Sequence, residues 1–383
     1  MNNFDFRNPT ELIFGKGEIA KLPSRIKPGT RILMTYGGGS IFRNGIYNQV
    51  TEALKGYEIV EFGGIEANPD YSTLVKAIEI CKKQDIQMVL AVGGGSIIDG
   101  TKFIVAGARY EGDPWDFITG KAEISDALPF ATVLTLPATA SEMNNGAVIS
   151  RREFNEKFAF HSDHCYPQFS ILDPTAVYSL PVKQVANGIV DTYAHTLEQY
   201  LTTSISTRVM DRWAEGLLLT LIEVAPRLIK ADRNYDDCAD FMLTATMGLN
   251  GFIALGTDQD WATHMIGHEL TALHGLDHGV TLAIVHPGVM SVMRREKEAK
   301  LLQYAERVWG ITSGTTDERI DAAVARTEEF FRSLGMKTRL SEHNIGDETI
   351  STIVKRFRDR KWNVGEHGIV TPEKVEEILN RVK

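Results

Sequence analysis

Five of the ten histidines lie within residues 258–287, which read DQDWATHMIGHELTALHGLDHGVTLAIVHP. A neutral imidazole is a good ligand for zinc, iron, nickel or cobalt, and a carboxylate adds charge and hardness to such a site. Upstream, Asp191 and His195 stand four residues apart in a segment with a helical pattern, which places both side chains on one helix face. The spacing therefore predicts a metal site with mixed oxygen and nitrogen ligands. Its four ligands would be Asp191, His195, His264 and His278.

These histidines also have a plainer interpretation, since one histidine on a helix is more often a packed or solvated residue than a ligand. The combination of several imidazoles with a carboxylate favours a metal. Such a metal would be catalytic, because structural zinc sites are usually rich in cysteine and use closely spaced ligand pairs. No cysteine lies near this cluster, and the ligand segments are far apart in the sequence. This arrangement suits an open site that can accept a substrate oxygen.

Length and composition predict a globular protein of about two domains, because the chain has 383 residues, 43% of them hydrophobic and 24% charged. A net charge of -9 without a basic stripe argues against nucleic acid as a partner. The N-terminal residues do not resemble a signal peptide, and no apolar run approaches the ~20 residues that span a bilayer. Three scattered cysteines, Cys81, Cys165 and Cys238, favour a reducing compartment. We therefore expect a cytoplasmic protein with no membrane partner.

Strand and helix patterns alternate through the first half of the chain, which implies βαβ units and a mostly parallel sheet. A first strand-like segment lies near residues 10–14. Later strand patterns begin at residues 31, 57, 86, 131 and 169, and helical patterns cover residues 71–85 and the segment that ends near 108. Pro174 and Pro181 mark the expected end of this domain.

Two of the predicted strands run into the sequence Gly-Gly-Gly-Ser, at residues 37–40 and 93–96. Glycine lets backbone N–H groups approach a phosphate, and the N-terminus of a following helix adds partial positive charge. The pattern is neither GxGxxG nor a Walker A loop, and one such loop alone is explained by ordinary turn chemistry. Two such loops, each after a predicted strand, are stronger evidence for a phosphate-binding site than one loop alone. In a third loop, Thr139 and Ser141 could bind phosphate or ribose, or could simply cap a helix.

From Val182 onward the strand patterns disappear and helical periodicity takes over. We therefore expect an α/β dinucleotide-binding domain over residues 1–181 and an all-helical metal-binding, catalytic domain over residues 182–383, with the active site in the cleft between them. The helical patterns cover residues 184–201, 211–230, 237–255, the histidine segment, 301–309 and 321–334.

Several motifs together resemble the iron-containing (group III) alcohol dehydrogenase family. They are GGGSIID at 93–99, PATASE at 137–142, ILDPTAVYSLP at 171–181, D-x-x-x-H at 191–195 and H-x-x-x-H-x(9)-H at 264–278. The similarity covers essentially the whole chain and is strongest to the branch of NADPH-dependent aldehyde reductases and butanol dehydrogenases. It implies a dehydroquinate synthase-like fold, with an α/β N-terminal domain and an all-α C-terminal domain.

The resemblance also implies roles for individual residues. It assigns the same four metal ligands and places His268 beside the metal, as a catalytic or substrate-side group. It places the pyrophosphate at the second glycine loop, Asp99 near the nicotinamide, and Lys157 near the ribose. The expected cofactor contacts are Gly37, Gly38, Gly39, Ser40, Gly94, Gly95, Ser96, Asp99, Thr135, Thr139, Ser141 and Lys157.

The first glycine loop bears on the choice of cofactor. NAD-preferring relatives tend to carry an aspartate there, which bonds the ribose hydroxyls and would repel a 2′-phosphate. This chain has Gly38, Gly39 and Ser40 instead, with Arg43 close behind, so we expect NADP(H). The resemblance further implies one Fe(II) or Zn(II) ion, a homodimer, and interconversion of short-chain primary alcohols such as butanol with their aldehydes by hydride transfer.

Other functions fit parts of the same pattern. A polyol or glycerol dehydrogenase of the same family would share the fold and the metal. A lyase of the dehydroquinate synthase type would also share the fold, but it disagrees with the missing acidic residue in the first loop. A metalloprotease is excluded, since the second histidine of HExxH after His268 and Glu269 would be residue 272, which is Ala272. A nonenzymatic metal-binding protein would not need the glycine- and serine-rich loops.

Overall fold

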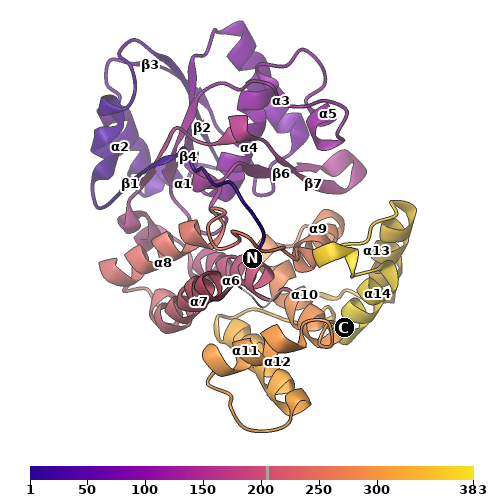
Figure 1. The fold of residues 1–383 in the computed structure, drawn as a ribbon. Coiled ribbons are helices and arrows are strands. Elements are labelled where there is room, and N and C mark those ends of the chain that lie inside the picture. The colour runs from indigo at the N-terminus through magenta and orange to yellow at the C-terminus, as the bar shows by residue number, and fades with distance from the viewer. Residues whose placement is uncertain (204–206) are drawn as a thin grey trace. The chain divides into compact units, whose positions relative to one another are not determined.

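The structure is a computed structural model that describes residues 1–203 and 207–383. The chain forms two compact units, each of which is described by itself below (Figure 1). One unit consists of Arg7–Pro181 together with Asp232–Thr246. The other consists of Met1–Phe6, Val182–Ala231 and Met247–Lys383.

The first unit is built on a six-stranded sheet in which every pairing is parallel, as the alternating patterns predict. Its strand order is β1-β8-β5-β4-β2-β3, so the chain runs from β2 outward to β3 and then returns to place β4 on the other side of β2. The order therefore reverses between β2 and β4. The strands are β1 (Glu11–Phe14), β2 (Arg31–Tyr36), β3 (Glu58–Phe62), β4 (Met88–Gly93), β5 (Phe130–Leu134) and β8 (Phe169–Leu172).

Helices and an antiparallel hairpin surround this sheet. The predicted helices are α3 (Tyr71–Lys83) and α4 (Gly95–Gly107). Asp70 caps the N-terminus of α3, because its carboxylate accepts a hydrogen bond from the Ser72 N–H. The hairpin, β6 (Gly146–Arg151) with β7 (Glu156–His161), was not predicted. Neither strand has more than two consecutive buried residues, so both lack the continuous buried run of a core strand. The remaining helices are α1 (Ser40–Arg43), α2 (Ile46–Ala53) and α5 (Trp115–Ile118).

The second unit is helical, and together with the parallel sheet it confirms the predicted fold class. Its described residues include no strand beyond an isolated bridge between Val364 and Val370. The helix α8 (Tyr235–Gly248) begins in the first unit and ends in this one. The other helices are α6 (Val182–Tyr200), α7 (Arg208–Leu228), α9 (Ala262–His274), α10 (His278–Val292), α11 (Glu298–Arg307), α12 (Thr316–Ser333), α13 (Asp347–Asp359) and α14 (Pro372–Arg381).

One predicted helix is shorter than its sequence pattern. Helical periodicity extends over residues 237–255, but α8 ends at Gly248 and the chain continues in turns to residue 261. Gly251 and Gly256 have positive φ values of 89° and 68°, which a helix cannot contain. The Asn250 side chain also accepts the Phe252 N–H, so a local turn replaces the next helical hydrogen bond.

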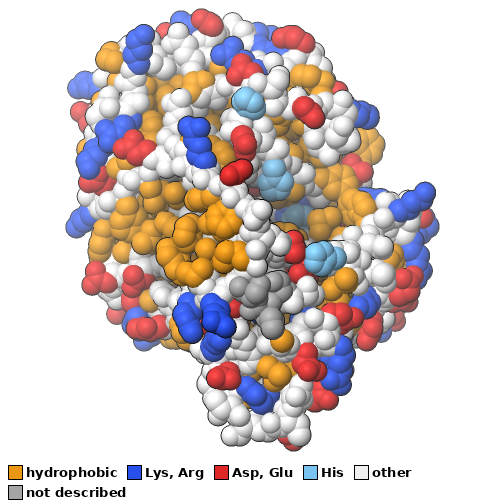
Figure 2. Space-filling model, in the orientation of Figure 1, with side chains coloured by type: hydrophobic (Ala, Val, Ile, Leu, Met, Phe, Trp, Pro, Cys, Tyr) orange, Lys and Arg blue, Asp and Glu red, His pale blue; other side chains and the backbone are white. Residues whose placement is uncertain are grey.

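The thiols of Cys81, Cys165 and Cys238 are all buried and unpaired. None of the helices in the described ranges is both long enough and apolar enough to cross a membrane. On the face of the molecule shown in Figure 2, lysine and arginine side chains are interspersed with acidic ones.

Candidate metal centre and glycine loops

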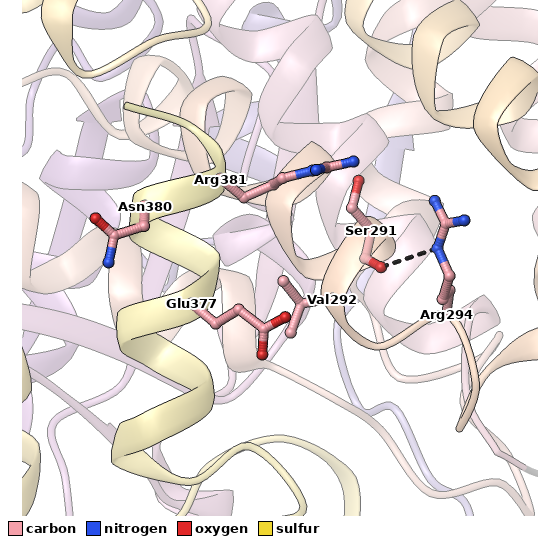
Figure 3. A pocket seen from close by; sticks show the side chains of 6 residues that line it. All are labelled: Ser291, Val292, Arg294, Glu377, Asn380 and Arg381. Atoms are coloured by element: carbon pink, nitrogen blue, oxygen red, sulfur yellow. Dashed lines mark hydrogen bonds between the residues drawn. The ribbon is translucent and has the colours of Figure 1, made fainter.

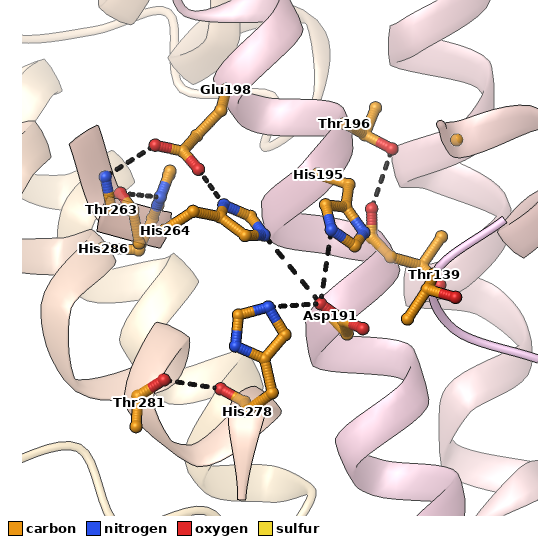
Figure 4. Close-up of polar contacts among 12 residues, drawn as sticks. Thr139, Asp191, His195, Thr196, Glu198, Thr263, His264, His278, Thr281 and His286 are labelled. Atoms are coloured by element: carbon orange, nitrogen blue, oxygen red, sulfur yellow. Dashed lines mark hydrogen bonds and ion pairs between the residues drawn. The ribbon is translucent and has the colours of Figure 1, made fainter. Parts of the chain in front are cut away.

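The four predicted metal ligands come together within the helical unit (Figure 4). Helix α6 carries Asp191 and His195, α9 carries His264, and His278 is the first residue of α10. The Oδ1 atom of Asp191 lies 3.5 Å from Nε2 of His195, 3.5 Å from Nε2 of His278 and 4.0 Å from Nε2 of His264. All four ligand atoms lie within 4.8 Å of one another.

This cluster fits a divalent transition metal. Ligand bonds of about 2.1 Å in a tetrahedral site place the ligand atoms about 3.4 Å apart. The separations of 3.5, 3.5 and 4.0 Å measured from Asp191 are close to this value. The donor set, three imidazole nitrogens and one carboxylate oxygen, suits iron, zinc, nickel or cobalt. The rings of His195 and His264 are stacked 4.5 Å apart, and Asp191, His195 and His264 are buried whereas His278 is partly exposed. The partly exposed side is consistent with access for a substrate.

The start of α10 is held against α6 by two features of the sequence. Asp277, which immediately precedes α10, pairs with Lys183 at 2.7 Å and accepts a hydrogen bond from Asn187 at 3.2 Å. Gly279 allows the close approach of the two helices, because a Cβ atom there would lie 2.6 Å from the backbone oxygen of Asn187. The neighbouring His278 is thereby brought to Asp191 on α6.

Glu198 is a residue of this site that the sequence analysis missed. One carboxylate oxygen of Glu198 contacts Nδ1 of His264, and the other accepts the backbone N–H of Thr263 at 2.6 Å (Figure 4). Burial, followed by the nearby carboxylate of Asp260, raises the pKa of Glu198 well above its usual value. A divalent cation at the cluster would act in the opposite direction, since it favours negative charge nearby. The sequence could have revealed Glu198 through its position on α6, which puts it on the same helix face as Asp191 and His195.

Two more histidines lie near the cluster but are not among its four ligands. His268, on α9, is 7% exposed, and its ring centre lies 5.4 Å from that of His278. His286 is buried on α10, where its Nδ1 atom lies 3.0 Å from the hydroxyl of Thr263. Burial lowers the pKa of His286 to about 3, so this ring is neutral at physiological pH.

Other polar clusters in the helical unit have partners that explain them. Glu366 accepts two hydrogen bonds from Thr203, and the exposed His367 pairs with Asp258 at 3.5 Å. Figure 3 shows the side chains around a surface pocket of about 440 Å³, which include Arg294. Arg294 is already paired with Asp317 and Asp321. The side chains around that pocket belong to Ser291, Val292, Arg294, Glu377, Asn380 and Arg381.

In the α/β unit, the two glycine loops follow neighbouring strands. Residues 37–40 come directly after β2 and residues 94–96 directly after β4, and Tyr36, the last residue of β2, pairs with Val92, the last but one of β4. The strand order reverses between β2 and β4. In open α/β sheets, ligands bind outside the carboxyl ends of the strands at such a reversal. Both loops therefore lie where a nucleotide is expected.

The second glycine loop is packed tightly against the loop after β5. A Cβ atom at Gly94 would lie 2.9 Å from the Leu136 side chain, and one at Gly95 would lie 2.4 Å from the Thr139 hydroxyl. Thr135 donates its N–H to the backbone oxygen of Gly93 at 3.0 Å. The glycines are therefore required by packing within the protein as well as by any approach of a phosphate. Thr135 and Thr139, two of the expected cofactor contacts, lie beside this loop.

Asp99 is held by two hydrogen bonds within the protein. It accepts the hydroxyl of Ser141 at 2.6 Å and the backbone N–H of Val148, on the hairpin, at 2.9 Å. Lys102, one helical turn further along α4, is fully buried and donates to Asn144 and to the backbone oxygen of Gly146. Burial raises the pKa of Asp99 and lowers that of Lys102 to about 8.

Asn68 links two of the predicted cofactor contacts and was not itself predicted. Its side-chain oxygen accepts a hydrogen bond from Lys157 at 2.9 Å, and its backbone N–H donates to the hydroxyl of Ser96 at 3.3 Å. Its φ of 53° lies in the left-handed region, which asparagine tolerates better than most residues. The signal in the sequence was an asparagine directly before Pro69, a pattern typical of a turn.

Comparison with known proteins covers nearly the full chain. The description "Iron-containing alcohol dehydrogenase" matches residues 9–174, and "Fe-containing alcohol dehydrogenase family, C-terminal" matches residues 185–382. The chain is 52% identical to the NADPH-dependent aldehyde reductase YqhD of Escherichia coli over 97% of each protein. It is 43% identical to a probable NADH-dependent butanol dehydrogenase of Bacillus subtilis over 100% of this chain and 99% of that protein.

Solved structures show the same relationship. The crystal structure of E. coli K-12 YqhD superposes with a TM-score of 0.98 at 51% identity, covering 100% of this chain and 99% of that one. The NADH-dependent butanol dehydrogenase A of Thermotoga maritima superposes with a TM-score of 0.95 at 37% identity, with the same coverage. The chain therefore belongs to the iron-containing alcohol dehydrogenase family.

Proposed function

We propose that this protein is a metal-dependent, NADP(H)-dependent alcohol dehydrogenase that interconverts short-chain primary alcohols, such as butanol, and their aldehydes. The observation that carries the proposal is the cluster of Asp191, His195, His264 and His278 in a chain that is 52% identical to an NADPH-dependent aldehyde reductase. In this proposal residues 1–181 form the dinucleotide-binding domain, and residues 182–383 form the metal-binding catalytic domain.

Asp191 and the three histidines are the residues that would hold one Fe(II) or Zn(II) ion. The ion supplies a Lewis acid that polarises a carbonyl group and stabilises negative charge on its oxygen. Asp191 adds one negative charge to a set of otherwise neutral ligands, so the occupied site keeps a net positive charge. By being the only charged member of the four, Asp191 would leave part of a divalent cation's positive charge available to a developing alkoxide.

The glycine loops and the residues tied to them form the proposed nucleotide site. NADPH supplies the hydride for aldehyde reduction. The backbone N–H groups of Gly95 and Ser96 are proposed to hold the pyrophosphate, which is supported by their position at the start of α4. Asp99, Thr135, Thr139, Ser141 and Lys157 complete the proposed contacts beyond it. Gly37, Gly38, Gly39 and Ser40 are proposed to accept the adenosine ribose with its 2′-phosphate, because no carboxylate in this loop opposes it.

His268 is the proposed carrier of the proton that the product alcohol gains. It lies on the same helix as His264, and its ring centre is 5.4 Å from that of His278. An imidazole near neutral pH can release and regain a proton in each cycle.

Two further parts of the proposal concern the whole protein. A cytoplasmic location is supported by three buried, unpaired thiols, which suit a reducing compartment. A homodimer is supported by β1 (Glu11–Phe14), which ends the sheet and pairs with β8 alone among the described strands. An edge strand offers unpaired backbone groups to a second copy of the chain. Analytical ultracentrifugation of the purified protein would measure the mass of the assembly.

The deciding experiment is the initial rate of butanal reduction by protein reconstituted with Zn(II) or Fe(II), with NADPH and NADH compared side by side. We expect a rate with NADPH that disappears on chelation and returns with metal. The variant Asp191→Asn is the matched control, because it removes the ligand charge and leaves the glycine loops intact. It should lose metal and activity while retaining NADPH binding, measured by fluorescence.

Other outcomes would change specific parts of the proposal. Equal or better rates with NADH would overturn the proposed role of residues 37–40 but keep the dehydrogenase. Reduction of hydroxylated substrates such as dihydroxyacetone, without reduction of butanal, would identify a polyol or glycerol dehydrogenase. A rate that survives complete removal of metal would overturn the proposed role of the four ligands.

A further inference from the structure

Glu198 lies on the same face of α6 as two of the proposed ligands, three residues after His195 and seven after Asp191. Its side chain is almost fully buried, with the whole residue 2% exposed. A carboxylate taken out of water is costly unless its oxygens are hydrogen-bonded or paired with charge. The partners of Glu198 therefore indicate what it does.

We propose that Glu198 is the positioning residue of the metal centre, which keeps a proton on Nδ1 of His264 and so directs Nε2 toward the metal. One oxygen of Glu198 contacts Nδ1 of His264, and Nε2 on the opposite side of the ring faces Asp191 at 4.0 Å. A neutral imidazole carries one proton, so the nitrogen that donates to the carboxylate leaves the other with its lone pair. Like the proposed function, this role requires the cluster to bind a divalent cation.

The second oxygen of Glu198 fixes the carboxylate independently of His264. It accepts the backbone N–H of Thr263 at 2.6 Å, in the first turn of α9. N–H groups in a first turn have no acceptor within their own helix, and Trp261, at the N-cap, makes no side-chain capping bond. Glu198 supplies that acceptor from another helix, and its charge is favourable at a helix N-terminus. The carboxylate is therefore held by the backbone of the helix that carries His264.

A second carboxylate at this helix end is compensated by a buried lysine. Asp260 accepts the N–H of Ala262 at 3.0 Å and pairs with Lys297 at 2.6 Å. Both residues of this ion pair are nearly fully buried. Because Lys297 balances Asp260, the charge of Glu198 is the one directed at His264 and the cation.

Glutamine cannot satisfy both partners of Glu198. If its oxygen accepts from Thr263, its NH₂ group faces Nδ1 of His264, which must then accept and carry its proton on Nε2. If the amide turns around, its NH₂ group faces the Thr263 N–H, and two donors meet. The variant Glu198→Gln therefore keeps the size of the side chain but opposes the ring protonation that metal binding needs.

The test compares metal affinity in the full-length wild type, Glu198→Gln and Glu215→Gln. Glu215 is the matched control, since it is also a buried carboxylate of the helical unit but accepts from Tyr200 at 2.9 Å and from Arg307 rather than from a ligand. Zn(II) affinity is measured by competition with a chromophoric chelator, and the Co(II) absorption spectrum reports the ligand geometry. We expect Glu198→Gln to weaken Zn(II) binding about 10- to 100-fold, as loss of such carboxylate partners does. Glu215→Gln should bind as the wild type does.

Wild-type affinity and an unchanged Co(II) spectrum in Glu198→Gln would overturn the role of Glu198. If Glu198→Gln does not fold, Glu198→Asp decides by the same criterion, because a side chain shorter by one methylene cannot reach both partners. In the zinc-loaded wild type, nitrogen-15 spectra of the histidines must show His264 bound through Nε2 with a protected Nδ1 proton. Binding through Nδ1 would also overturn the proposal. Failure of the wild type itself to bind Zn(II) would instead overturn the proposed function.

Discussion

Gly95 and Thr139 are packed so closely that a Cβ atom on residue 95 would lie 2.4 Å from the Thr139 hydroxyl. Gly95→Ala therefore has to move either the loop after β5 or the start of α4. We expect a loss of about 1–3 kcal/mol in the free energy of unfolding, as for other overpacked sites, and weaker NADPH binding. Urea unfolding and fluorescence titration measure the two effects. Unchanged values for both would mean that this contact has room to relax.

Gly38 offers a position at which cofactor choice can be reversed. A Cβ atom there meets nothing within 4 Å in the described part of the chain, so an aspartate fits without steric cost. Its charge would oppose the 2′-phosphate of NADPH by about 1–2 kcal/mol, or roughly 5- to 30-fold in KM. Gly38→Asp should therefore raise KM for NADPH and leave KM for NADH equal or lower. A parallel rise in both values would show that the residue does not contact the phosphate.

At Asn68, the contributions of the side chain and of the backbone can be tested separately. Asn68→Gly keeps the positive φ and the bond from the backbone N–H to Ser96, but it removes the oxygen that accepts from Lys157. Loss of one such bond, about 1 kcal/mol, should weaken NADPH binding roughly fivefold. Metal content should not change, because the four ligands belong to the helical unit. Asn68→Ala, which also strains the backbone, should in addition lower the melting temperature.

His268 should matter for turnover but not for metal content. It is not one of the four residues whose ligand atoms lie within 4.8 Å of one another. His268→Ala is expected to lower kcat by about two orders of magnitude, as loss of a proton-transfer group does. Metal analysis of the purified variant should match the wild type. Unchanged turnover would remove His268 from the mechanism.

His286 should make the metal-free protein less stable in acid. Its folded pKa is about 3, below the usual value of 6.5, so between these values the unfolded chain binds the proton that the folded protein excludes. Above pH 6.5 both states are neutral at this residue and there is no penalty. At pH 5 the penalty should be about 2 kcal/mol. Urea unfolding at pH 8 and pH 5, with chelator present, should show the wild type losing about that much more stability than His286→Gln. An equal loss of stability in the wild type and in His286→Gln would contradict the low pKa of His286.

The helical unit and the pairing of Asp191 with His195 on one helix face were predictable, because a single periodicity decides the outcome there. Asp191 and His195 are recognisable because a spacing of four on a helix brings a carboxylate and an imidazole to one face. The parallel sheet follows from strands that are buried on both sides and alternate with helices. The C-terminal end of α8 did not follow, since the glycines after it override an apolar pattern that continues past Gly248.

Residues that act through tertiary contacts were less accessible to sequence reasoning. Glu198 looks like any glutamate on a helix until α9 places His264 and the Thr263 N–H against it. Asn68 is sequence-distant from Lys157, and the hairpin that carries Lys157 has no run of buried residues. Such contacts depend on how elements pack, and the local sequence contains little information about that.

Residues 232–246, which include most of α8, belong to the α/β unit although they come after the first helices of the other unit. Within the α/β unit, Thr246 donates to the buried Glu142 at 2.6 Å, and Arg233 donates to the backbone oxygen of Leu180 at 2.7 Å. A gene cut after residue 181 would separate each of these pairs and leave Glu142 without its hydroxyl donor. Neither unit corresponds to one uninterrupted stretch of coding sequence. Shuffling this enzyme with its relatives, or transplanting its metal-binding part, therefore requires several exchange points rather than one.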